Sequence, residues 1–207
     1  MATEYRGCRG LVYAKVLTDT AEGMTFGEVK PLAPVQQVQR EVSRSSATTF
    51  YDNVGSNVTS AEGAEINNFV VGVPDDEVMA DIEGKYYDPE TGIYSDSPIS
   101  DSYYAVGYIL GEKGDNTTES YCWKNKGTFQ ISSTEHNTEN DGTDTTNVTV
   151  AFTSIYPNAK FTHGGKDGQG GKSKGVRVKA NKTKFTEETF FASVQTVDTA
   201  YTIEKGA

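Results

Sequence analysis

The chain contains little cysteine and histidine, and this scarcity limits the chemistry open to it. Its 207 residues include two cysteines, Cys8 and Cys122, and two histidines. Zinc sites need clustered cysteine and histidine ligands, and the sequence has neither a CxxC pattern nor a paired-histidine motif. We therefore expect no metal and no cofactor. The sequence leaves open whether the two cysteines form a disulfide.

Long hydrophobic runs are missing as well. No stretch reaches the roughly 18 apolar residues of a membrane-spanning helix. The polar stretch after Met1 lacks the basic and apolar regions of a signal peptide. We expect no membrane span, and a protein that is synthesised and used in a reducing cytosol.

Helical periods rich in Leu and Ala are also absent, whereas Thr, Asn, Gly and Tyr are abundant. This composition suits half-exposed strands joined by turns. Residues 34–42 fit either a helix or a strand, and we favour a strand because Pro34 and the serines that follow leave little room for a helix. The other strand-like runs are residues 9–17, 26–33, 65–73, 103–110, 120–131, 147–155, 175–180 and 197–204.

Two short helices are predicted beside these strands. Pro74 suits a helix start, the acids after it favour the positive end of the helix dipole, and Gly84 suits a left-handed stop. The apolar stripe of this helix consists of Val78, Met79 and Ile82. The second helix covers residues 186–195 and is capped by Thr186. We predict one domain over residues 1–207, mainly β, with an antiparallel β-sandwich or barrel-like core and one or two short flanking helices.

Charge is unevenly distributed along the chain, whose net charge is −10. Residues 158–185 hold eight Lys and Arg against one Asp, which gives +7, and residues 75–101 hold nine Asp and Glu against one Lys, which gives −8. We expect a long polar loop at about residues 43–63 and a basic Gly/Lys-rich loop at about residues 158–175. Such polarised chains often bind a partner of opposite charge, which can be another copy of the same chain.

Two motifs suggest enzyme chemistry, and both have a simpler explanation. A glycosidase needs two carboxyls about 5–10 Å apart with one desolvated, whereas the helix at 74–84 accounts structurally for the acids Asp75, Asp76, Glu77, Asp81 and Glu83. In "GGKDGQGGKS", Gly165 and Gly171 enclose five residues where a phosphate-binding loop has four, and a strand-like run follows in place of a helix. We expect no enzymatic activity.

Several stretches in order resemble the major tail protein, or tail tube subunit, of long-tailed, non-contractile bacterial viruses. The matching pieces run across nearly the whole chain, and the resemblance depends on their order, since none is a chemical signature by itself. They are "RGLVYAKVLTD", "VKPLAPVQQVQREV", "SATTFYDN", "EGAEINNFVVGVPDDEVMADIEGKYYDPETGIYSD", "SYYAVGYI", "YCWKNKGTF" and "KFTEETFFASVQT". The basic loop has no counterpart in this pattern.

The resemblance implies a tail-tube fold whose copies assemble into hexameric rings and stack into a tube through which viral DNA passes during ejection. It implies a virion location, no catalytic residues, and as partners the chain itself, the tape measure, tail terminator and distal tail proteins, with DNA as non-specific cargo. On this pattern the polar loop would contact neighbouring subunits through Phe50, Tyr51 and Asp52.

Charge suggests a second set of contacts, in which the basic loop docks on an acidic neighbour through Lys166, Lys172 and Lys174. The sequence leaves open whether these lysines contact a neighbouring copy or DNA. An alternative function is a monomeric β-sandwich module that binds carbohydrate or protein, with Trp123 and exposed tyrosines stacking on sugars.

Overall fold

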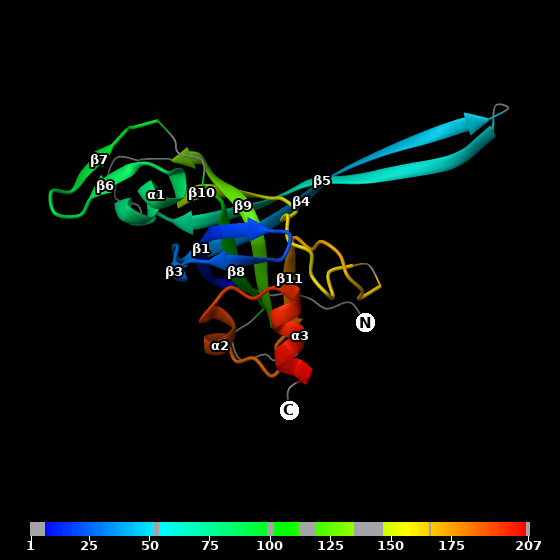
Figure 1. The fold of residues 1–207 in the computed structure, drawn as a ribbon. Coiled ribbons are helices and arrows are strands. Elements are labelled where there is room, and N and C mark those ends of the chain that lie inside the picture. Colours follow the sequence, from blue (N-terminus) through cyan, green and yellow to red (C-terminus); the bar gives the residue numbers. More distant parts are fainter. Residues whose placement is uncertain are drawn as a thin grey trace.

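A computed structural model describes residues 7–51, 54–98, 102–111, 119–134, 147–165 and 167–205. Most of the described chain consists of strands, with helices placed between and after them (Figure 1). In chain order the elements are β1 (Cys8–Thr20), β2 (Gly23–Phe26), β3 (Lys30–Pro31), β4 (Val35–Tyr51), β5 (Val54–Gly72), α1 (Asp76–Glu83), β6 (Tyr86–Asp88), β7 (Ile93–Ser95), β8 (Tyr104–Leu110), β9 (Ser120–Thr134), β10 (Asn147–Ser154), β11 (Gly175–Lys179), α2 (Glu187–Phe191) and α3 (Val197–Lys205).

One antiparallel sheet dominates the described residues. Its strands follow the order β2–β1–β8–β9–β10–β5–β4, with β3 paired to β1 and β11 paired to β9. The sheet curls so that β4, at one end of the strand order, contacts β1, and the backbone of Val38 on β4 lies beside the Cys8 thiol on β1. The predicted mainly β, antiparallel fold is confirmed.

The curled sheet separates two hydrophobic cores. Alternation along β10 buries Val148, Val150 and Phe152 completely in the inner core, as expected for a strand with one apolar face. The second core lies on the other face of the sheet, where α2 and α3 cover it and where Trp123 and Phe190 are fully buried. Both faces of β8 and β9 are therefore covered.

Helix α1 packs against the inner core through its buried Ile82 and half-buried Val78. Asp75 stands at its N-cap, and Gly84 ends it with φ of 66°, a left-handed conformation that glycine adopts without steric cost. The Tyr13 hydroxyl donates a hydrogen bond of 2.9 Å to the Asp81 carboxylate, which ties the helix to β1.

The predicted polar loop at residues 43–63 is wrong. These residues continue β4 and β5 as a paired hairpin, in which Ser45 lies opposite Ala61 and Thr48 opposite Val58. Hydrophobic alternation fails to reveal these strands because the described side chains, at residues 43–48 and 60–64, are exposed on both faces, so the pattern of a half-buried strand does not arise.

The strand predicted at residues 197–204 is also wrong, since α3 occupies this segment. Thr196 starts the helix with two reciprocal bonds, in which its Oγ1 accepts from the Thr199 N–H at 3.3 Å and its own N–H donates to the Thr199 Oγ1 at 2.8 Å. This capping outweighs the β-propensity of the Val, Thr, Tyr and Ile residues in the segment. The described chain thus has three helices, where one or two were predicted.

Two other elements are shorter than predicted. The helix expected at residues 186–195 ends at Phe191, although Thr186 caps it as predicted. The strand expected at residues 26–33 is divided between the end of β2 and the two-residue β3. Among the described helices, none combines the length and the apolar character that crossing a bilayer requires.

Candidate assembly surface

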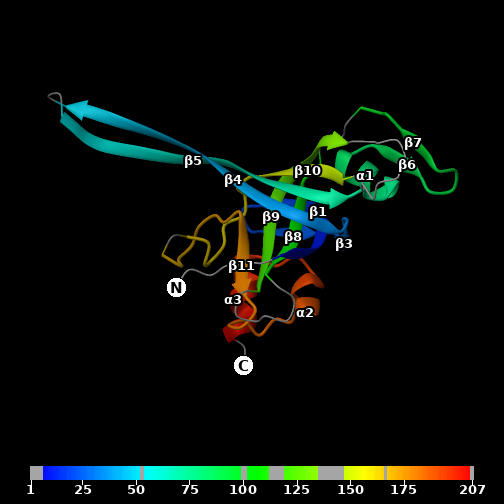
Figure 2. The same cartoon turned by 180° about the vertical axis from the view of Figure 1, so that it is seen from behind.

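The most unusual feature of the molecule is an arm formed by the far halves of β4 and β5, which we define as residues 43–51 and 54–64. β10 pairs with β5 from Gly72 only as far as Glu65. Beyond that point, each arm strand has the other arm strand as its neighbour in the described sheet. The arm extends away from the body in both views (Figures 1 and 2). Ten residues of strand span roughly 30 Å.

The arm is polar, and its outer edges carry little protection against pairing with another strand. Its described side chains, at residues 43–48 and 60–64, are all exposed. Arg44 and Glu62 are the charged residues of its sequence, which contains neither lysine nor proline. Natural proteins protect edge strands with lysine, proline or a covering element, and a lone two-stranded hairpin is marginally stable in water. These properties favour a strand partner for the arm.

Lys174 fixes the root of the arm to the body. Its side chain is 7% exposed, and its ammonium group donates to the Glu62 carboxylate at 3.0 Å and to the Gly63 carbonyl at 2.8 Å. The same ammonium lies 4.6 Å from the centre of the Tyr156 ring. The hydrogen bond from Lys174 lowers the pKa of Glu62 and so favours its carboxylate form.

A second ionic group lies one step further into the body. Glu65 is 2% exposed, and the Arg40 guanidinium grips its two oxygens with a pair of 2.8 Å contacts. Lys124 on β9 lies 2.6 Å from the same carboxylate. Burial raises the pKa of Glu65, but the hydrogen bonds from Arg40 and Lys124 outweigh burial and bring the pKa to about 2. The root of the arm is therefore held by two ionic groups, Lys174 with Glu62, and Glu65 with Arg40 and Lys124.

The basic loop at residues 158–175 is folded against the body by two aspartates. Asp19 on β1 accepts hydrogen bonds from the backbone N–H groups of residues 158 and 159 at 2.9 and 3.0 Å. Asp198 in α3 accepts from the N–H groups of residues 162 and 163 at 2.7 and 3.0 Å. In both views the loop lies on the opposite side of the body from α1 and the β6–β7 hairpin (Figures 1 and 2). The basic and acidic segments therefore do not neutralise each other within one chain.

The residues predicted to lie at subunit contacts fall into three groups. Asp52 and Lys166 lie outside the described residues, as do the side chains of Phe50 and Tyr51, whose backbones belong to the arm strands near its tip. Lys172 is exposed on the basic loop, whereas Lys174 is buried at the arm root. A contact of these residues with a neighbour stays a prediction. The helix residues occupy α1 or its ends, with Pro74 and Ile82 buried, Val78 and Met79 half-buried, and Gly84 at the C-cap.

The residues that hold the arm root were not identified from the sequence. Glu65, Asn67, Phe69 and Val71 occupy every second position of β5, which places them on one face of the strand, and all four side chains are buried. A carboxylate on the inward-facing positions of a strand requires a buried cation. The buried position of Glu65 in the strand pattern could therefore have predicted a buried cation, but the sequence does not show which Lys or Arg side chain supplies it.

Two other expectations concern single side chains. Trp123 is 0% exposed and its Nε1 donates to the Phe190 carbonyl at 3.2 Å, so it is not available to stack on a sugar, as the alternative binding-module hypothesis suggested. Cys8 and Cys122 are both free thiols. Among the described residues, no group of three or more His, Cys, Asp and Glu side chains comes together as a metal site would require.

Comparison with known proteins assigns no family to the chain. The sequence matches no protein-family model, and a search of curated proteins finds no significant match.

Proposed function

We propose that this chain is a self-assembling structural protein, the tail tube subunit of a long-tailed, non-contractile bacterial virus. Its copies form rings, hexameric on the pattern of the family it resembles, and the rings stack into a hollow tube through which DNA passes during ejection. Its further partners are the tape measure, tail terminator and distal tail proteins of the virion.

The arm is the observation that carries this proposal. Some ten residues on each strand extend from the body, the described side chains among them are all exposed, and each arm strand pairs with the other alone in the described sheet. A rigid root at Lys174 and Glu65 fixes the direction of the arm. A fixed direction and free backbone donors and acceptors are what strand addition to a neighbouring copy needs. A closed ring or a stacked tube would give every arm such a neighbour.

The separation of charge supports stacking in one direction. Identical rings that stack head to tail meet through two different surfaces of the same subunit. The basic loop and the acidic segment that includes α1 lie on opposite sides of the body, so each can face its counterpart on another copy. The acidic total charge also suits a conduit, because an acidic wall repels phosphates and lets DNA slide.

A matched pair of variants tests the role of the arm. Ala47→Lys adds a charge to an exposed position of the arm, and Gln39→Lys adds the same charge to an exposed position of β4 within the body. We expect the unmodified protein and Gln39→Lys to form large assemblies in sedimentation velocity experiments. We expect Ala47→Lys to sediment mainly as a monomer, because an edge lysine opposes strand addition.

The fold of each variant is checked by circular dichroism before sedimentation. If both variants assemble equally well, the arm is not part of the interface between subunits. If the unmodified protein stays monomeric at every salt and protein concentration, the tube proposal itself is refuted.

A further inference from the structure

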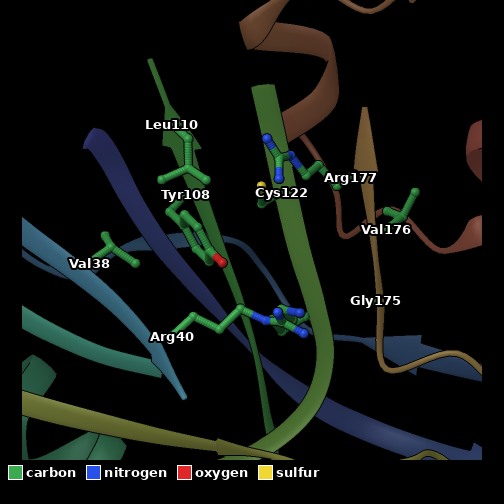
Figure 3. A pocket seen from close by; sticks show the side chains of 9 residues that line it. Val38, Arg40, Tyr108, Leu110, Cys122, Gly175, Val176 and Arg177 are labelled. Carbon is green, nitrogen blue, oxygen red and sulfur yellow. The ribbon is translucent and has the colours of Figure 1, made fainter. Parts of the chain in front are cut away.

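A cavity of about 370 Å³ opens between β4, β8, β9 and β11, at the end of the curled sheet near the arm root. Its walls are partly apolar, formed by Val38, Leu110 and Val176. Since a water molecule occupies about 30 Å³ in the liquid, the cavity has room for a small ligand. Figure 3 shows its lining side chains converging from different strands.

Three cationic side chains from three different strands line this cavity. Arg40 reaches across from β4 toward β9, and Arg177 on β11 lies beside Cys122, its partner in the strand register (Figure 3). Lys124 on β9 completes the set. None of the described lining residues is acidic. Glu65, which does not line the cavity, forms ion pairs with Arg40 and Lys124, so these three cations and one carboxylate leave a net charge of +2 beside the cavity.

A buried hydroxyl adds a neutral donor to the cationic groups. Tyr108 is 4% exposed, lines the cavity and points its hydroxyl toward the side on which Arg40 lies (Figure 3). The hydroxyl therefore faces the cavity, where it can donate to a bound ligand. Burial raises the pKa of the neighbouring Cys122 to about 11, although Arg177 and Lys124 act to lower it. The thiol therefore stays neutral and does not act as an internal anion.

We propose that this cavity binds a small tetrahedral oxyanion of the phosphate or sulfate type. Guanidinium groups bind oxyanions through short, charge-assisted hydrogen bonds. Because the donors approach from three strands, they suit an anion that presents oxygens in several directions better than a planar carboxylate. The Tyr108 hydroxyl supplies a further donor to the same anion. This site is independent of the tube proposal, since its lining residues all belong to one chain.

Binding of inorganic phosphate, sulfate and acetate to the full chain is measured by isothermal titration calorimetry at constant ionic strength. Arg177→Gln and Tyr108→Phe remove one donor each from the cavity. Lys179→Gln removes the same charge as Arg177→Gln from the same strand, at an exposed position that does not line the cavity. Circular dichroism establishes that each variant is folded.

We expect phosphate and sulfate to bind the unmodified protein and Lys179→Gln equally. Arg177→Gln should weaken binding by about tenfold or more, and Tyr108→Phe by about threefold or more, as expected for a lost charge-assisted and a lost neutral hydrogen bond. Three results would overturn the assignment. These are no binding of phosphate or sulfate at millimolar concentration, equal binding by all variants, and acetate binding as tight as that of phosphate.

Discussion

Replacement of Glu65 by glutamine is the most quantitative test of how the arm root is held. The carboxylate is buried and its pKa falls from 4.5 to about 2, although burial by itself would raise it. A difference of this size corresponds to about 3 kcal/mol in favour of the folded state at neutral pH. Glu65→Gln removes this contribution and leaves two partly buried cations without their partner.

The pH dependence gives the same prediction a second readout. Because the pKa of Glu65 is lower in the folded state than in the unfolded state, its contribution is complete above about pH 4.5. The contribution is lost progressively as the pH falls through about 2. The stability difference between the unmodified protein and Glu65→Gln should therefore be about 3 kcal/mol at pH 7 and should shrink toward zero at pH 2.

Urea unfolding at protein concentrations low enough to keep the chain monomeric measures both quantities. At pH 7 we expect the midpoint of Glu65→Gln to fall by about 1–2 M, for a denaturant dependence of 2–3 kcal/mol per M. Glu41→Gln, at an exposed position of β4, is the matched control and should leave the midpoint nearly unchanged. A loss below about 1 kcal/mol at pH 7, or a difference that does not change with pH, would refute the ionic account of the root.

Two further substitutions test the second core and the C-terminal helix. Gly107→Ala places a Cβ 2.9 Å from the Phe191 ring, so we expect a loss of about 1–3 kcal/mol in urea unfolding. Gly23→Ala, where no atom lies within 4 Å, is its control, and equal stability of the two variants would contradict tight packing at Gly107. Thr196→Ala removes the cap of α3 and should lower stability by about 1 kcal/mol with a loss of helical ellipticity. An unchanged circular dichroism spectrum and midpoint would mean that the cap does not stabilise α3.

Elements that bury one face were predictable from the sequence, because burial imposes a pattern on the residues. The alternation of Val148, Val150 and Phe152 indicated β10 correctly. The residues from Pro74 to Gly84 indicated the short helix that became α1, with its acids in the first turn and its left-handed stop. In both places, local propensity and the demands of the core agree.

The two large errors of the sequence prediction, at the arm and at residues 197–204, arose where local propensity and the demands of the core do not agree. The arm has no buried face among its described side chains, so its Ser, Thr and Ala residues predict a loop, although its two strands pair with each other. Residues 197–204 have β-branched and aromatic side chains, yet the reciprocal bonds of Thr196 and Thr199 start a helix there. The arm root could not be predicted either, since Glu65 meets Lys124 only through a fold that joins distant strands.

Electron cryomicroscopy of the purified, unmodified protein tests the central claim most directly. We expect hollow tubes of stacked rings, in which the arm of each subunit adds its strands to a neighbouring copy. Images that contain only single subunits, over the full range of salt and protein concentration, would contradict the proposed assembly.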